Sequence, residues 1–142
     1  MLVRLLYASR SSQPHTAALL ESILTQSHTH NPARGITGIL CYSGDIFMQV
    51  LEGSRSEVSA LYNSIVKDER HRDVELLLLE EISERRFASW TMGQVNLAKV
   101  NPSLLLRYSE KPELNPFALG GASSLALLEE LIATAAIVGR NK

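Results

Sequence analysis

Residues 46–51 read IFMQVL, an apolar run interrupted only by the carboxamide of Gln49. A run of this length between turn-forming residues is typical of a buried strand. A second apolar run, LVRLLY over residues 2–7, ends in Tyr7. Leaving a buried carboxamide unpaired costs roughly 1–3 kcal/mol per group, so we expect the Tyr7 hydroxyl and Gln49 to face each other from two core strands. This pair is either a structural hydrogen bond inside a sheet or part of a ligand site that both groups address.

The pattern on both sides of these runs predicts alternating strands and helices. The expected elements are a strand over 2–8, a helix over 14–29 ended by a loop at 30–35, hairpin strands over 36–42 and 46–51, a helix over 55–67, and strands over 74–79 and 90–97. This order, β-α-β-β-α-β-β, predicts an α+β fold of the ferredoxin-like split-βαβ type, in which two helices cover one face of a mixed sheet.

The composition changes after Val100. A short helix is expected over 102–108, then a linker containing Pro, Glu and Asn, and then a helix over 122–138. That last helix carries a wide apolar stripe formed by Leu125, Leu128, Leu131, Ile132 and Ala135. We therefore expect a domain over 1–98 and a C-terminal helical extension over 99–142, packed on the sheet or in an oligomer interface.

Size and charge exclude several classes of function. The chain has 142 residues, enough for one domain, and a net charge of -1 from 14 basic and 15 acidic residues, which disfavours a nucleic-acid partner. Its one cysteine, Cys41, lies in an apolar stretch and is expected to be a small buried hydrophobic residue. Neither a signal peptide nor a membrane-spanning run is present, so we expect a cytoplasmic protein without a membrane partner.

Common chemical motifs are missing from the sequence. The glycines of 35–38 and 120–121 match neither the dinucleotide fingerprint nor the P-loop. His28 and His30 flank a predicted helix end without a cysteine or carboxylate cluster beside them, so we assign no metal. No serine or cysteine has a partnered base at a readable spacing.

Five ordered blocks of this chain resemble the BLUF family of blue-light sensors, which bind a flavin noncovalently. The blocks are LLYAS at 5–9, NPARGITG at 31–38, FMQVLEG at 47–53, DERH at 68–71 and RFASWTM at 86–92. The resemblance runs without a gap from residue 2 to about residue 97. It implies FAD as cofactor, with FMN or riboflavin as alternatives.

The resemblance also implies roles for individual residues. Tyr7 matches the electron-donating tyrosine of the family, Gln49 its switching glutamine, and Asn31 the asparagine that holds the pyrimidine edge of the flavin. His30 matches a neighbouring position that commonly touches the ring. The segment that contacts the ribityl and phosphate part of FAD corresponds to Asp68, Arg70 and His71, and the two residues that exchange places at the flavin pocket correspond to Trp90 and Met92.

A flat ring with apolar faces and one polar edge suits a space between two helices with aliphatic faces. Candidate walls of that space are Ile23, Leu24, Phe47 and Ile65, although core packing is the more usual explanation for any one of them. Arg70 and His71 could offset phosphate charge at the mouth, or belong to a solvated turn. Trp90 could instead be a ring packed at the sheet edge.

The resulting hypothesis is a blue-light photoreceptor and not an enzyme. Light drives electron and proton transfer from Tyr7, and Gln49 rearranges, which red-shifts the flavin and signals to a separate effector protein, through a homo-oligomer. A flavin-dependent enzyme on the same scaffold is the main alternative, because fold alone does not determine function. A third possibility is an assembly module that binds no chromophore.

Overall fold

The computed structural model describes residues 1–12, 16–134 and 137–141 and contains a five-stranded sheet in the order β4-β1-β3-β2-β5. Its strands are β1 (Leu2–Ser11), β2 (Thr37–Ser43), β3 (Ile46–Ser54), β4 (His71–Ile82) and β5 (Gly93–Asn96). All paired strands are antiparallel except β2 and β5. The helices are α1 (Thr16–Arg34), α2 (Arg55–Lys67), the 3₁₀ turn η1 (Leu97–Lys99), α3 (Pro102–Leu106), α4 (Pro116–Leu119) and α5 (Gly121–Ala133). The ferredoxin-like order predicted from the sequence is confirmed.

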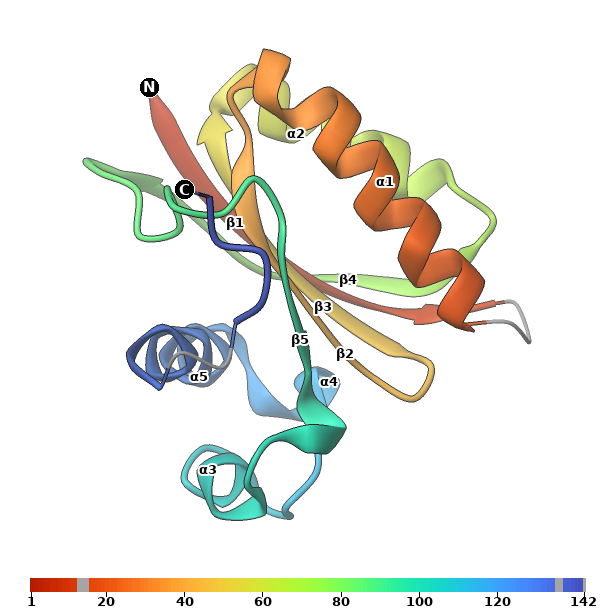
Figure 1. The fold of residues 1–142 in the computed structure, drawn as a ribbon, viewed down its shortest axis with the longest axis vertical. Coiled ribbons are helices and arrows are strands. Elements are labelled where there is room, and N and C mark those ends of the chain that lie inside the picture. The colour runs from red at the N-terminus through yellow and green to blue at the C-terminus, as the bar shows by residue number, and fades with distance from the viewer. Residues whose placement is uncertain (13–15, 135–136, 142) are drawn as a thin grey trace.

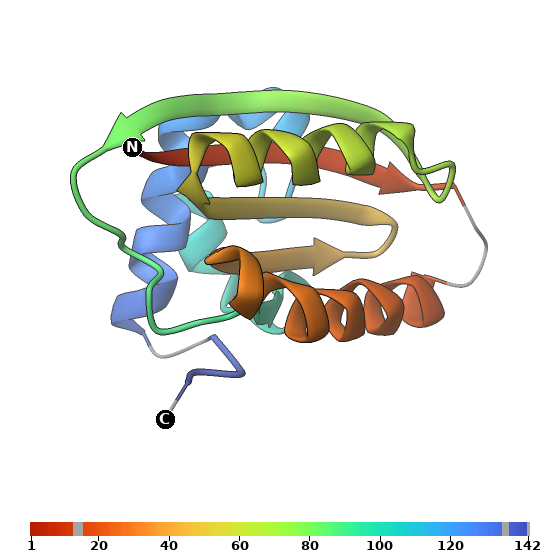
Figure 2. The same ribbon diagram turned by 90° about the horizontal axis from the view of Figure 1, so that it is seen from above.

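Helices cover both faces of this sheet (Figure 1). Helices α1 and α2 lie side by side on one face, and the central strands are visible between them in Figure 2, whereas α5 lies on the opposite face. Because side chains alternate along a strand, β1 sends Val3, Leu5 and Tyr7 toward α1 and α2 and Leu6 toward α5. The sheet therefore separates two apolar clusters, and Tyr7 belongs to the one under α1 and α2.

The loop predicted at 30–35 is wrong, because α1 continues through Pro32 to Arg34. The helix ends in a Schellman motif, in which Ile36 N–H donates to the Asn31 carbonyl at 3.0 Å and Gly35 N–H donates to the Pro32 carbonyl at 3.3 Å. Gly35 has a φ of +67°, a conformation that glycine adopts without strain. The helix persists past Pro32 because its final turn is closed by these two bonds, and Asn31 therefore lies on a helix and not in a loop.

Other predicted boundaries also shift. The helix expected over 122–138 ends at Ala133, and Val138 instead forms an isolated antiparallel bridge with Gln94. The last strand begins at Gly93, so Trp90 and Met92 lie in the segment that leads into β5. Positions 13–14 at the predicted start of the first helix, and Ala135 in the apolar stripe, lie outside the described residues.

A buried ion pair crosses the α5 face of the central strands. Glu52 is fully buried, and its carboxylate accepts from Arg4 Nε at 2.9 Å and from the backbone N–H of Phe87 at 2.7 Å and of Arg86 at 3.2 Å. Arg4 also pairs with Glu80 at 2.7 Å. This carboxylate thus fixes the start of the chain segment that carries Trp90 and Met92.

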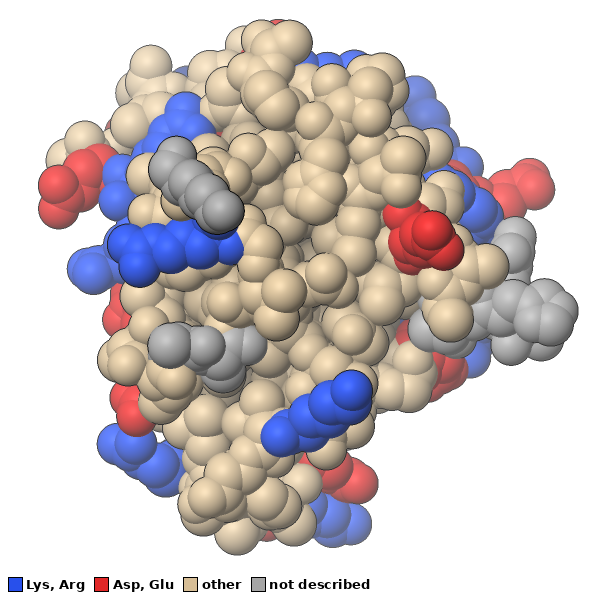
Figure 3. All heavy atoms as spheres, in the orientation of Figure 1, with Lys and Arg blue, Asp and Glu red and all other residues tan. Residues whose placement is uncertain are grey.

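Charges of both signs are mixed on the face drawn in Figure 3, where they lie mainly around the rim. No helix within the described part of the chain is long and apolar enough to cross a membrane.

Candidate functional site

Tyr7 and Gln49 lie directly opposite each other in the register of β1 and β3. Both side chains are buried, with 1% and 2% of their surface exposed, and the Tyr7 hydroxyl donates a short hydrogen bond to Gln49 Oε1. The position follows from strand alternation, since both residues occupy positions that face α1 and α2. The sequence-based expectation that the two groups face each other is met by this geometry.

Met92 contacts the amide nitrogen end of the Gln49 carboxamide. Gln49 Nε2 lies 3.2 Å from the Met92 sulfur, a weak acceptor. Met92 is buried in the same apolar cluster as Tyr7, whereas Trp90 packs in the cluster on the α5 side of the sheet. The structure therefore places Met92 toward Gln49 and Trp90 away from it.

A cavity of about 260 Å³ opens beside Tyr7 and Gln49, between α1 and α2. The residues of α1 that line it recur at helical spacing, as do those of α2, so each helix contributes one stripe. The lining residues are Tyr7, Ile23, Gln26, Ser27, His30, Asn31, Arg34, Gln49, Leu61, Ser64, Ile65, Asp68, Arg70 and His71. The volume is slightly below the ~300–1,000 Å³ usual for small-molecule sites, which suits one flat ring system with its longer substituents outside.

Asn31 brings an unsatisfied polar group to this cavity. The residue is 2% exposed, and its Nδ2 is buried with no hydrogen-bond partner among the described residues. Buried polar groups are normally paired, so this amide calls for an acceptor that lies in the cavity. Aliphatic walls from Ile23 and Ile65, together with an amide donor at one edge, fit the flavin ring of FAD.

The Tyr7 phenol has the protonation state that a hydrogen donor needs. Burial raises its pKa well above the usual value, and the nearby Tyr62 and Asp68 raise the pKa further. The Tyr62 ring lies 5.7 Å from the Tyr7 ring, centroid to centroid, in a tilted arrangement. Tyr7 therefore stays neutral at physiological pH and keeps the proton that it shares with Gln49.

The cavity mouth carries an ion pair between Asp68 and Arg70. Arg70 Nη2 lies 2.6 Å from Asp68 Oδ2, and Arg70 Nη1 donates to Ser22 Oγ at 2.8 Å. The side-chain hydrogen bonds that Arg70 donates to Asp68 hold the pKa of the Asp68 carboxyl below its usual value. Most of the Arg70 donors already have partners, so the pair presents little net charge to a phosphate. Arg34 is a second cation at the mouth, and it is exposed.

His71 lines the same cavity from the start of β4. Its Nδ1 lies 3.0 Å from the Ser9 hydroxyl, and its ring meets that of Phe47 edge to face. Burial lowers the pKa of His71, although the charge of Asp68 opposes this effect. The ring is therefore held in its neutral form.

Nine of the residues predicted from the sequence line the cavity: Tyr7, Ile23, His30, Asn31, Gln49, Ile65, Asp68, Arg70 and His71. Leu24 and Phe47 lie in the apolar cluster behind it, and Met92 reaches the site through Gln49. Sequence reasoning missed Gln26, Ser27, Arg34, Leu61 and Ser64. Their helical spacing from Ile23 and Ile65 could have indicated that they line the same cavity. Arg34 could not be placed on this stripe, because the first helix was expected to end at residue 29.

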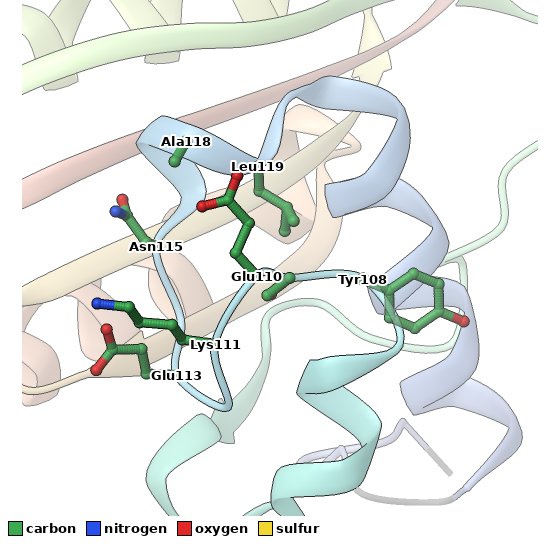
Figure 4. A pocket seen from close by; sticks show the side chains of 8 residues that line it. Tyr108, Glu110, Lys111, Glu113, Asn115, Ala118 and Leu119 are labelled. Atoms are coloured by element: carbon green, nitrogen blue, oxygen red, sulfur yellow. The ribbon is translucent and has the colours of Figure 1, made fainter.

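A different hollow, of about 350 Å³, lies in the C-terminal extension and is lined by residues of the 108–119 region. Figure 4 shows Lys111, Glu113 and Asn115 on one side of it and Tyr108 on the other. Its lining mixes charged and polar groups with the aliphatic side chains of Ala118 and Leu119. No group of three or more His, Cys, Asp or Glu residues in the described ranges could hold a metal ion.

Comparisons with known proteins agree with the geometry. A family model described as "Sensors of blue-light using FAD" matches residues 2–93. The photoactivated adenylate cyclase subunit alpha of Euglena gracilis is 36% identical over 88 residues, which are 62% of this chain and 9% of that protein. The blue light- and temperature-regulated antirepressor BluF of Escherichia coli strain K12 is 32% identical over 97 residues, 68% of this chain and 24% of that protein.

The chain thus spans less than a quarter of the length of these two curated relatives. It matches the structure titled "BlsA photo-activated state" along almost the whole length of both, with a TM-score of 0.84 at 31% identity, covering 100% of this chain and 99% of the other. The chain belongs to the BLUF family, sensors of blue light using FAD.

Proposed function

We propose that this chain senses blue light through proton and electron transfer from Tyr7 and a rearrangement of Gln49. The observation that carries the proposal is the hydrogen bond from the buried Tyr7 hydroxyl to Gln49 Oε1 at the floor of the cavity. Bound FAD supplies the absorption of blue light and, once excited, an acceptor for one electron.

The cofactor would be held by the residues that line the cavity. Asn31 Nδ2, which lacks a partner among the described residues, would donate to the polar edge of the ring, and Ile23 and Ile65 would pack on its faces. His30, His71 and the Asp68–Arg70 pair, which line the same cavity, would lie near the ribityl and phosphate part, where Arg34 would add an exposed positive charge. Leu24 and Phe47 support the walls from behind.

Tyr7 has one defined route for its proton. The phenol gives up an electron, and its acidified hydroxyl proton moves along the existing hydrogen bond to Gln49 Oε1. Burial disfavours a charged phenolate, so the proton does not leave before the electron. It follows the electron, and both return to Tyr7 when the charges recombine.

The Gln49 carboxamide is suited to keep a changed hydrogen-bond pattern after the electron and the proton have returned to Tyr7. One end of a carboxamide donates and the other accepts, so rotation or tautomerisation reverses the local hydrogen-bond pattern without any net charge. A new donor from Gln49 to the flavin carbonyl would lower the transition energy and redden the absorption. A single bond is worth about 0.5–1.5 kcal/mol net, enough to bias a balanced packing equilibrium.

The change at Gln49 reaches Met92 directly, because Gln49 Nε2 contacts its sulfur. We propose that Met92 and Trp90, β5 and the extension over 99–142 pass the change to a separate effector protein, through a homo-oligomer that rearranges. The curated relatives support an effector, since in them this region makes up a small part of a cyclase subunit or an antirepressor.

The experiment is a blue flash on purified protein loaded with FAD, followed by difference absorption spectra. A reversible red shift in the wild type and its loss in Gln49→Leu are expected, while Gln94→Leu, at a half-buried glutamine outside the cavity, should keep the shift. A yellow wild-type protein without a reversible shift would refute the proposal. Turnover of the bound flavin with an added reductant would favour the enzyme alternative.

A further inference from the structure

Residues 137–141 form a strap along the outer side of the segment that carries Trp90 and Met92. Figure 1 shows this strap, in dark blue, beside the chain that leads into β5. Val138 N–H donates to the Gln94 carbonyl and Gln94 N–H donates to the Val138 carbonyl, both at 3.0 Å. Asn141 N–H donates to the Ser89 carbonyl at 2.6 Å. The strap therefore holds both ends of the segment 89–94.

Side chains of the strap add to these backbone bonds. Ile137 is 9% exposed and packs against Gly93, where an added Cβ would lie only 2.7 Å from Ile137 Cγ2 and from Trp90 Cδ1. The Arg140 guanidinium lies 5.7 Å from the Trp90 ring centroid, and Thr91 Oγ1 donates to Asn141 Oδ1 at 3.2 Å. The strap thus contacts the segment at Ser89, Trp90, Thr91, Gly93 and Gln94.

The Met92 side chain lies on the side of Tyr7 and Gln49. Its sulfur accepts from Gln49 Nε2, and its carbonyl lies 3.2 Å from His28 Nε2 on α1. The segment 89–94 is therefore held between the site on its inner side and the strap on its outer side. Reversal of the Gln49 amide would turn Oε1 toward the Met92 sulfur, and two acceptors facing each other repel.

We propose that the strap is a positioning element for Met92: it stabilises the dark arrangement of Gln49 and is released when that arrangement changes. The inference rests on the proposed function, since it assigns the strap a part in the same photocycle. Coupling between two sites is reciprocal. If the rearranged Gln49 weakens the strap, then a weakened strap must shift the equilibrium toward the rearranged Gln49. We expect a lit state stabilised in this way to return to the dark state more slowly.

Position 138 offers a matched pair of variants. The Val138 side chain is 61% exposed, so Val138→Ala keeps the backbone bonds and loses little packing. Val138→Pro removes the N–H that donates to the Gln94 carbonyl. We expect return to the dark state to slow roughly two- to tenfold in Val138→Pro and to stay within about twofold of the wild type in Val138→Ala.

Hydrogen exchange provides a readout independent of the flavin spectrum. In the dark, FAD-loaded wild-type protein, the amides of Gln94 and Val138 should be protected, and continuous blue light should speed their exchange. Val138→Pro should speed exchange of the Gln94 amide in the dark. Ile137→Ser, which removes the buried anchor, is a second way to release the strap and should also slow recovery.

The outcomes separate this inference from the function on which it rests. A wild type that shows the red shift, with recovery at the control rate in variants whose Gln94 amide is exposed, overturns the strap's role and leaves the photosensor intact. Unprotected Gln94 and Val138 amides in the dark also overturn it. A wild type without any red shift refutes the proposed function, and the strap's part in the photocycle with it.

Discussion

The Tyr7 hydroxyl donates to Gln49 Oε1 across a directly opposed pair of β1 and β3 residues, with both side chains almost fully buried. Two polar groups in an apolar cluster satisfy each other, so the pair costs the core little. The same bond gives the phenol a single proton acceptor.

Tyr7→Phe should bind FAD and lose the red shift, because the ring remains and the proton does not. It leaves Gln49 Oε1 buried without its donor, which should lower the free energy of unfolding by about 1–3 kcal/mol. Flash difference spectra and urea denaturation measure the two effects. Tyr62→Phe removes the hydroxyl of the neighbouring ring and should retain the shift. A normal photocycle in Tyr7→Phe would contradict the assigned role.

Asn31→Ala should weaken FAD binding roughly tenfold, which corresponds to about 1.4 kcal/mol for one lost amide hydrogen bond. The reason is the buried Asn31 Nδ2, which has no partner within the described part of the chain and belongs to a residue that lines the cavity. Fluorescence titration of apoprotein with FAD measures the dissociation constant. Asn63→Ala, at an exposed position of α2, is the control. Equal affinities in the two variants would exclude Asn31 from the flavin site.

The burial of His71 should make stability depend on mildly acidic pH. Burial lowers its pKa in the folded protein, whereas the unfolded chain has a histidine pKa of about 6.5. The unfolded state therefore binds the proton more readily, and stability present above about pH 6.5 is lost as the pH falls toward the folded-state pKa. Thermal melts from pH 7.5 to pH 5 should show a smaller slope for His71→Gln than for the wild type. Identical slopes would show that His71 does not carry this effect.

Glu52→Ala should lower the free energy of unfolding by about 3 kcal/mol, as expected when one partner of a buried ion pair is removed. The substitution also removes the carboxylate that accepts hydrogen bonds from the backbone N–H groups of Phe87 and Arg86. Glu81→Ala breaks the exposed pair with Arg55 and should change stability by less than about 1 kcal/mol. Urea denaturation compares the two. Similar small losses would mean that the Glu52 pair is not well formed.

The order of elements could be predicted from apolar runs and helical spacing, both of which are visible in the sequence. The Tyr7–Gln49 pair could be predicted because an unpaired carboxamide is costly in a buried strand. The end of α1 could not be predicted in this way, because Pro32 and Gly35 are usual helix breakers and the Schellman bonds that close the helix form only in three dimensions. Because the last turn of α1 was not predicted, Arg34 was not recognised as a residue that lines the cavity. The bridge between Val138 and Gln94 was also unpredictable, since a long-range contact of one residue leaves no periodicity.

The Tyr7–Gln49 register also limits how this protein can evolve. Successive strand residues alternate between faces, so inserting or deleting one residue ahead of Tyr7 in β1, or of Gln49 in β3, would turn that side chain toward α5 and away from the cavity. Changes of two residues would preserve the face. Length variation among descendants of this chain should therefore fall in the turns and in the region after β5, while β1 and β3 change by substitution alone.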